Sequence, residues 1–311
     1  MGQLLRKSRI TVTGAGGFLG PVAVDVLAAA GACVQAIIGP PNEDARAPVR
    51  AACVAQADIF DSSALRKLVA GADEVVHLAG PASVAASFQD PSRYLRIHTE
   101  GTAAVLEACR AERVPKLVYV SSAEVYGRPL RSPVDEDHPL SARSPYGAAK
   151  IGAEKLIESY VHAFDLNAVI LRPFSIYGPG ASPESLIARI IGMARRGLPV
   201  VLRDLKPIRD YCFVTDVAGA IARACSVQGR GLEVLNIGTM QGTSVERVAA
   251  LVLDALGVSC PLEGSNERDR PGSSEIYELI ADNRRAREVL GWAPAVPLDH
   301  GLRMTVSGLV R

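Results

Sequence analysis

The sequence predicts an α/β protein with a doubly wound parallel sheet and a smaller C-terminal lobe. Over the first half of the chain, short β-branched runs alternate with Ala- and Leu-rich helical stretches, which is typical of a parallel sheet covered on both faces. Near-continuous apolar runs such as LVYV (117–120) and AVIL (168–171) indicate strands buried on both sides. A glycine-rich bend stands between the first predicted strand and the first predicted helix.

The predicted elements of the large lobe follow in order along the chain. The strands are Arg9–Thr13, Cys33–Ile38, 74–78, 116–121 and 168–172, and the helices are 18–30, 62–70, 99–112 and Pro145–Phe164. Beyond Arg172, prolines separate shorter helices at 184–196, 244–256 and 283–290. We therefore expect residues 1–174 in the large domain, with 210–236 returning to it, and residues 175–209 and 237–311 in the smaller lobe.

The composition excludes several classes of protein. The chain has 311 residues, 48% hydrophobic and 22% charged, with a formal net charge of +1. The apolar content excludes intrinsic disorder, and the near-neutral charge argues against a nucleic-acid-binding protein. The longest uncharged stretches contain glycine or proline and fall short of the ~20 apolar residues of a membrane span, so no membrane association is expected.

Cysteine usage predicts a cytoplasmic protein. The six cysteines are dispersed without a CxxC pair, and the five histidines show no ligand spacing. We therefore expect reduced thiols and no metal site. The first apolar run leads into the glycine bend rather than a small-residue cleavage site, so the N-terminus does not resemble a signal peptide.

The bend TVTGAGGFLG places Gly14, Gly17 and Gly20 three residues apart. Such a bend turns the chain sharply, admits a pyrophosphate close to the backbone and packs a helix tightly on a strand. The helix N-terminus then offers unpaired N–H groups to the phosphates. A plain glycine turn is the alternative. The position between strand and helix favours a Rossmann-type dinucleotide site that includes Phe18 and Leu19.

The choice between NAD and NADP depends on the end of the second strand. An acidic residue there selects NAD, but Ile38 occupies the place and no basic residue stands there to hold the NADP phosphate. We expect NAD and leave NADP open. Asp58, followed by Ile59, is a candidate for the adenine end, and a helix cap is the alternative for Asp58.

Tyr146 and Lys150 are four residues apart in SPYGAAK, so on a helix they share one face. A tyrosine with a pKa of about 10 is a poor base at neutral pH, and a neighbouring ammonium favours its phenolate. Ser122, at the end of the strand LVYVSS, is the candidate to hold the substrate oxygen. An exposed helix with incidental Tyr and Lys is the alternative.

The segments TGAGGFLG, HLAG, SSAEVYG, SPYGAAK, LRPFSIYGPG, RDYCFVTDVAGAI and NIGTMQGTSV resemble the extended short-chain dehydrogenase/reductase family. More narrowly, they resemble its NAD-dependent nucleotide-sugar epimerases and dehydratases. The resemblance implies that Tyr146 removes the proton of a sugar hydroxyl, that Ser122 binds the same oxygen and that Lys150 holds the nicotinamide ribose. The cofactor-binding residues that it adds are Leu78, Ala79 and Gly80.

Some positions depart from the pattern of that family. Ala123 and Glu124 stand where glucose-type dehydratases carry Asp and Glu, so the acid that would protonate a leaving hydroxyl is absent. Glu124 stays a catalytic candidate, with a salt-bridged or solvated carboxylate as the alternative. His98 replaces an asparagine that is usual in relatives, and Ser175 replaces one that helps to hold the nucleotide.

Arg209 in IRDY and Arg270 in DRPG match positions at which relatives clamp the substrate diphosphate, a task that suits a guanidinium fork. A surface arginine is the alternative for each. The substrate-binding candidates are Ser122, Ser175, Arg209 and Arg270. Helices 99–112 and Pro145–Phe164 resemble the pair by which relatives form a homodimer through a four-helix bundle, and burial within one chain is the competing interpretation.

The sequence therefore predicts a cytoplasmic NAD-dependent epimerase/dehydratase acting on a nucleotide sugar through a C-terminal substrate-binding lobe, with a 4-epimerase as the first interpretation. A 4,6-dehydratase or a 4-keto reductase of deoxysugar biosynthesis is the runner-up. A non-catalytic, cofactor-sensing regulatory protein is the alternative of another class, against which the retained Ser122, Tyr146 and Lys150 argue. Arg209 and Arg270 argue against a reductase of non-sugar ketones.

Overall fold

The computed structural model describes residues 5–40, 48–227, 231–265, 271 and 273–308. A seven-stranded sheet runs in the order β10-β6-β5-β4-β1-β2-β3, and all its neighbouring strands are parallel. Its strands are β1 (Arg9–Thr13), β2 (Cys33–Ile38), β3 (Cys53–Gln56), β4 (Glu74–His77), β5 (Lys116–Val120), β6 (Asn167–Pro173) and β10 (Leu232–Ile237). The strand order reverses between β1 and β4, so the predicted doubly wound sheet is confirmed.

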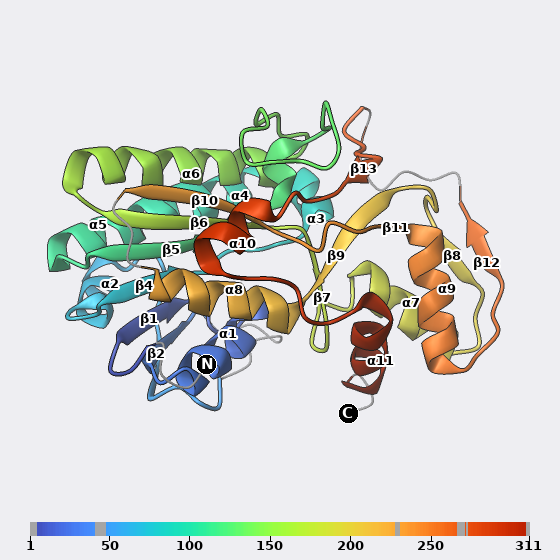
Figure 1. The fold of residues 1–311 in the computed structure, drawn as a ribbon, viewed down its shortest axis with the longest axis horizontal. Helices are drawn as coiled ribbons and strands as arrows, with labels where there is room; N and C mark the ends of the chain where they lie inside the picture. The colour runs from blue at the N-terminus through green and yellow to red at the C-terminus, as the bar shows by residue number, and fades with distance from the viewer. Residues whose placement is uncertain (1–4, 41–47, 228–230, 266–270, 272, 309–311) are drawn as a thin grey trace.

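Helices cover both faces of the sheet (Figure 1). On one face lie α2 (Ser62–Val69), α5 (Gly101–Glu112) and α6 (Pro145–Phe164). On the other lie α1 (Leu19–Ala29), α8 (Val214–Ser226) and α10 (Arg284–Leu290). Each layer packs against the sheet in its own apolar core, which explains the continuous apolar runs of the central strands.

A second lobe stands beyond the carboxyl ends of the strands, at the right of Figure 1. One of its sheets has the order β11-β9-β13 with β7 also paired to β9, and the other pairs β12 with β8. The strands are β7 (Ser175–Tyr177), β8 (Val200–Leu202), β9 (Ile208–Phe213), β11 (Gly242–Ser244), β12 (Leu262–Gly264) and β13 (Glu278–Leu279). Its apolar core includes α7 (Leu186–Arg195), α9 (Val245–Leu256) and α11 (Leu298–Gly308).

The predicted elements agree with the structure to within two residues at each end. Strand β3 was not predicted because it lies at the sheet edge and is largely exposed, so it has no apolar run. Chain segments from 214 to 237 return to the large sheet through α8 and β10, whereas β9 pairs within the second lobe. The exact division of the chain between the lobes stays a prediction. In the described part of the chain, no helix is long and apolar enough to cross a membrane.

Candidate active site

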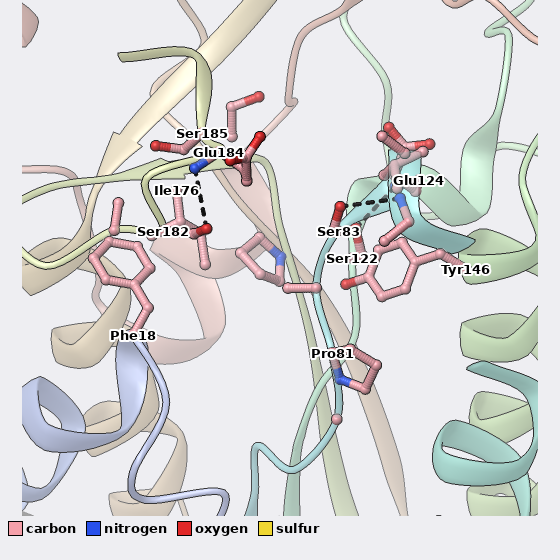
Figure 2. Close-up of a pocket in the computed structure, with 18 of the residues that line it drawn as sticks. Phe18, Pro81, Ser83, Ser122, Glu124, Tyr146, Ile176, Ser182, Glu184 and Ser185 are labelled. Carbon is pink, nitrogen blue, oxygen red and sulfur yellow. Dashed lines mark hydrogen bonds between the residues drawn. The ribbon is translucent and has the colours of Figure 1, made fainter. Parts of the chain in front are cut away.

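A cleft with a volume of about 2520 Å³ separates two walls. The sheet wall consists of the glycine bend after β1, the segments following β4 and β5, and the start of α6. The lobe wall consists of β7, the segment leading into α7, and β9. Figure 2 shows the Tyr146 hydroxyl pointing into the cleft from the sheet wall, with Ile176 and Ser182 on the opposite side. In open α/β sheets, ligands bind at this edge.

The glycine bend fits a dinucleotide. Gly14 has φ +71°, and a Cβ there would lie 2.5 Å from the backbone nitrogen of Ala79. At Gly20, a Cβ would lie 2.4 Å from the carbonyl oxygen of Ala15, so glycine lets α1 begin close to the bend. At Gly17, a Cβ would meet only the Gly14 oxygen, at 3.5 Å, and this position lines the cleft. The bend therefore presents bare backbone to the cleft, which is what a pyrophosphate requires.

Val120, Ser121 and Ser122, at the end of β5, lie against three successive turns of α6. Lys150 Nζ donates a hydrogen bond of 2.8 Å to the carbonyl oxygen of the last β5 residue. The Ser121 hydroxyl donates to Glu154 Oε1 at 2.5 Å, and the side chain of Ser122 lies close enough to Tyr146 to act against the rise of its pKa. Because Tyr146, Lys150 and Glu154 are spaced four residues apart, they share one face of α6.

The buried carboxylate of Glu154 is balanced by Arg172 of β6. Arg172 Nη2 donates to Glu154 Oε2 at 2.7 Å, and Arg172 Nε donates to Oε1 at 3.1 Å. Arg172 also donates to the Tyr126 hydroxyl at 2.8 Å, and that hydroxyl donates to Asn236 Oδ1 at 2.7 Å. A buried ion pair is tolerated where it is bidentate and its remaining polar atoms form hydrogen bonds. This network therefore fixes the strand ends beneath Ser122.

Burial governs the charges of Tyr146 and Lys150 in the chain alone. It raises the pKa of Tyr146 above its ordinary value, against the opposing effect of Ser122. It also lowers the pKa of Lys150 to about 7, against the opposing charge of Glu154. Lys150 Nζ lies 5.9 Å from the centroid of the Tyr146 ring. The phenol thus stays protonated in the chain alone, whereas the sequence predicts a phenolate favoured by the ammonium. Further positive charge in the cleft is needed to favour the phenolate.

Glu124 lies on the sheet wall beside the serine–tyrosine pair (Figure 2). It stands in a short 3₁₀ turn, η2 (Ala123–Tyr126), where its backbone N–H donates to Ser122 Oγ at 3.2 Å. Its side chain is buried and lines the cleft, and its negative charge opposes ionisation of Tyr146. The turn therefore brings a single carboxylate toward the phenol.

The lobe wall carries the candidates for substrate binding. Ser175 belongs to β7 and Arg209 to β9, and both line the cleft. Arg209 Nη2 lies 3.6 Å from Glu275 Oε1, with the side chains 14% and 19% exposed. Arg270 lies outside the described residues. The structure thus places one of the two predicted arginines in the cleft.

The glycine bend, the set of Ser122, Tyr146 and Lys150, and the cleft together match a redox enzyme that binds a dinucleotide. Residues 10–238 match the model of the NAD dependent epimerase/dehydratase family. The chain belongs to this family. The resemblance to extended short-chain dehydrogenases/reductases is therefore confirmed, and the protein is an enzyme of the epimerase/dehydratase family.

Relatives in this family catalyse more than one reaction. The UDP-glucose 4-epimerase of Mycolicibacterium smegmatis is 34% identical, over 96% of this chain and 97% of its own length. The dTDP-glucose 4,6-dehydratase of Streptomyces griseus is also 34% identical, over 96% of this chain and 93% of its own. Identity alone therefore does not separate the two reactions.

Solved structures of the family carry nicotinamide cofactors. MoeE5 in complex with UDP-glucuronic acid and NAD has a TM-score of 0.89 and 30% identity, covering 97% of this chain and 99% of that chain. RMD from Pseudomonas aeruginosa, complexed with NADPH, has a TM-score of 0.83 and 27% identity, covering 97% of this chain and 98% of that one. Both cofactor types occur on this fold.

The epimerase/dehydratase cleft contains the residues expected to hold the cofactor. Ile38 ends β2, and Asp58 and Ile59 line the neighbouring part of the cleft. The cap of α2 is Asp61, whose carboxylate accepts from the third helical N–H, so Asp58 is not that cap. The other expected cofactor residues that line the cleft are Gly14, Gly17, Phe18, Leu19, Gly20, Leu78, Ala79, Gly80, Tyr146 and Lys150.

The sequence analysis missed some residues around the site. Glu154 could have been found from its spacing of four residues beyond Lys150, since that places it on the same helical face. Arg128 and Glu275, which also line the cleft, lie in irregular segments whose position no local pattern reveals. The Arg128 guanidinium donates to the Glu275 carbonyl oxygen at 3.1 Å, which ties the loop after η2 to the second lobe.

Proposed function

We propose that this enzyme is a nucleotide-sugar 4-epimerase that works with bound NAD. The observation that carries the proposal is the Tyr146 hydroxyl, which lies near Ser122 and is directed into the cleft of a family member. Ala123 supports it further, because this residue occupies the position of the acid that a dehydratase uses to expel water. The family membership and the 34% identical UDP-glucose 4-epimerase agree with this reaction.

The proposed mechanism depends on proton transfer at a single oxygen. NAD, when bound, supplies the hydride acceptor. Gly14 and Gly17 hold its diphosphate and Lys150 holds its nicotinamide ribose. Tyr146 Oη, ionised by the positive charges around it, removes the proton of the C4 hydroxyl, and Ser122 Oγ donates a hydrogen bond to the same oxygen. Tyr146 would return the proton to the same oxygen once the sugar has presented its other face, and C4 is inverted because the hydride taken from it would be given back to that face.

The lobe wall holds the substrate in this proposal. Arg209 binds the diphosphate of the nucleotide sugar together with Arg270, because a guanidinium fork matches phosphate oxygens. Ser175 contributes a hydroxyl from β7. Asp58 lies at the adenine end of the cofactor site. The residue at the end of β2 is Ile38 and not an arginine or lysine that could hold the extra phosphate of NADP, which favours NAD.

A 4,6-dehydratase is the second candidate, supported by Glu124. This carboxylate is buried, lines the cleft and lies close enough to Tyr146 to oppose its ionisation. A dehydratase of Streptomyces griseus is as similar to the chain as the epimerase is. The alanine at position 123 argues against this reaction, since the acid that protonates the leaving hydroxyl would have to come from another part of the chain.

We further propose a cytoplasmic homodimer formed through α5 and α6. Phe164, at the end of α6, is 50% exposed. It contacts the guanidinium of Arg110, which pairs with Glu107 on α5. Substituting Phe164→Glu is expected to halve the mass measured by light scattering, whereas Val258→Glu, at another exposed apolar residue, leaves it unchanged. A dimer that persists in Phe164→Glu would contradict this interface.

The reaction is tested with NAD-loaded protein and a panel of UDP-, dTDP-, GDP- and CDP-hexoses. A bound nucleotide sugar raises the melting temperature by mass action, and NMR then identifies the product. We expect inversion at C4, intact C6 and full recovery of NAD. A 4-keto-6-deoxy product would establish the dehydratase instead, and stoichiometric consumption of NAD(P)H would establish a reductase. No stabilisation by any nucleotide sugar would contradict the substrate class.

A further inference from the structure

The side chain of Glu275 lies against Arg209, the residue proposed to bind the substrate diphosphate. Glu275 Oε1 is 3.6 Å from Arg209 Nη2, and both residues line the cleft. The side chains of Glu275 and Arg209 are only 19% and 14% exposed. A guanidinium buried to this extent requires an anion beside it, because an unpaired charge kept from water is costly. In the chain alone, Glu275 supplies that negative charge.

The ion pair of Arg209 and Glu275 is long in comparison with the buried ion pair of the sheet wall. Arg172 Nη2 lies 2.7 Å from Glu154 Oε2, within the usual ~2.7–2.9 Å of a hydrogen bond between charged groups. The 3.6 Å between Arg209 Nη2 and Glu275 Oε1 exceeds that range. A phosphate that approaches Arg209 can accept two parallel hydrogen bonds from the guanidinium. Arg209 therefore gains by exchanging the carboxylate for a diphosphate.

Both members of this ion pair have partners of their own. Arg209 Nη1 donates to the carbonyl oxygen of Ile208 at 3.0 Å, which orients the guanidinium independently of Glu275. Glu275 Oε1 accepts from the N–H of Ile276 at 3.1 Å, and the carbonyl oxygen of Glu275 accepts from Arg128 Nη2 at 3.1 Å. The contact between the two side chains can therefore open while both segments keep their backbone positions.

We propose that Glu275 is a counter-ion that the diphosphate of the nucleotide sugar displaces from Arg209. The inference rests on the proposed nucleotide-sugar site. A neutral nucleoside cannot replace the carboxylate, whereas a diphosphate exchanges one anion for another and matches the guanidinium fork. The exchange lowers the affinity of each ligand that must displace Glu275. The residue thus selects for a diphosphate at a cost in affinity.

The test measures how nucleoside diphosphates bind to the NAD-loaded protein. Calorimetry gives the dissociation constants of UDP, dTDP, GDP and CDP and of the four corresponding nucleosides. Glu275→Gln keeps the size of the side chain and removes its charge. Glu278→Gln is the matched control, since Glu278 is a carboxylate on β13 that lines a separate, smaller pocket. Melting temperatures verify that the variants fold.

We expect Glu275→Gln to tighten the binding of the nucleoside diphosphate by about tenfold, because the ligand no longer competes with a carboxylate. The affinity for the nucleoside should stay the same, and Glu278→Gln should change neither affinity. If the gain arises at Arg209, adding Glu275→Gln to Arg209→Ala should not tighten the diphosphate. The double variant thus separates competition for Arg209 from repulsion at a distance.

Three results would overturn the proposal while the substrate site stands. Weaker binding of the diphosphate by Glu275→Gln would mean that the carboxylate itself holds the ligand, and unchanged binding would mean that no exchange takes place. An equal gain in the Arg209→Ala background would assign the effect to repulsion at a distance. If none of the four diphosphates binds to the unmodified protein or to Glu275→Gln, the nucleotide-sugar site itself is wrong, and this inference fails with it.

Discussion

The two walls of the cleft are built in different ways. The sheet wall consists of strand ends and helix starts, and the polar groups of Lys150 and Glu154 are buried there and bonded to backbone or to other side chains. The lobe wall consists of the strands β7 and β9 and the segment leading into α7, and its candidates Ser175 and Arg209 are only partly buried.

This difference separates chemistry from substrate choice. A group that transfers a proton must be positioned to within fractions of an ångström. A strand end that is hydrogen-bonded to a helix provides this precision. Substrate recognition tolerates loops, which vary among members of one fold. Relatives with different reactions are therefore equally similar to this chain overall. The comparison predicts that substitutions of the proton-transferring residue on the sheet wall lower turnover. Substitutions on the lobe wall are expected to lower the affinity for the nucleotide sugar.

The largest effect is expected for Tyr146→Phe on the sheet wall. Removing the oxygen proposed to accept the sugar proton should lower kcat by about 10²–10⁴-fold, because that is the usual contribution of a general base. The substitution keeps the buried ring, so NAD⁺ should still bind. Turnover and NAD⁺ affinity are measured on the same preparation.

Tyr160→Phe is the matched control for this substitution. Tyr160 stands on the same helix, but its hydroxyl donates to Glu107 on the outer side of α5 and α6. Its removal should leave kcat unchanged. Turnover by Tyr146→Phe at the rate of the unmodified enzyme would remove the phenol from the mechanism and with it the proposed role of the sheet wall.

Local sequence patterns account for more of the sheet wall than of the lobe wall. The glycine bend, the end of β5 and the spacing of Tyr146 and Lys150 are short-range features, and parallel strands bring such features to one edge. Arg128 and Glu275 meet across the cleft because of how two distant segments fold, which neither segment encodes alone. The protonation of Tyr146 depends on burial, and burial is a property of the whole fold.

A smaller effect is expected for Arg209→Ala on the lobe wall. Loss of a charged hydrogen bond to a diphosphate should weaken the nucleotide sugar by about 10–100-fold, while NAD⁺ affinity stays constant. Arg209→Lys should lie between, since it keeps the charge but loses the fork. Arg303→Ala, which breaks an exposed ion pair on α11, serves as the control. Equal weakening of cofactor and substrate would contradict the separate roles of the walls.

The smallest effect is a pH dependence of NAD⁺ affinity that arises from Lys150 on the sheet wall. Its pKa in the chain alone is lowered to about 7, so above pH 7 the side chain is neutral, whereas holding the ribose requires the ammonium. Binding then takes up a proton, and the dissociation constant of NAD⁺ should rise with pH by at most about tenfold per unit above pH 7 and stay flat below it. His77 and His98 do not titrate in this range, since burial lowers their pKa values to about 3 and about 2.

Calorimetry in two buffers of different ionisation enthalpy should show uptake of nearly one proton at pH 8 and none at pH 6, and Lys150→Met should abolish the difference. The lowered pKa of Lys150 in the folded chain also predicts that the free energy of unfolding rises with pH above about 7, because the unfolded chain then binds more protons than the folded one. A pH-independent NAD⁺ affinity in the unmodified protein would mean that Lys150 does not supply the charge that the sheet wall needs.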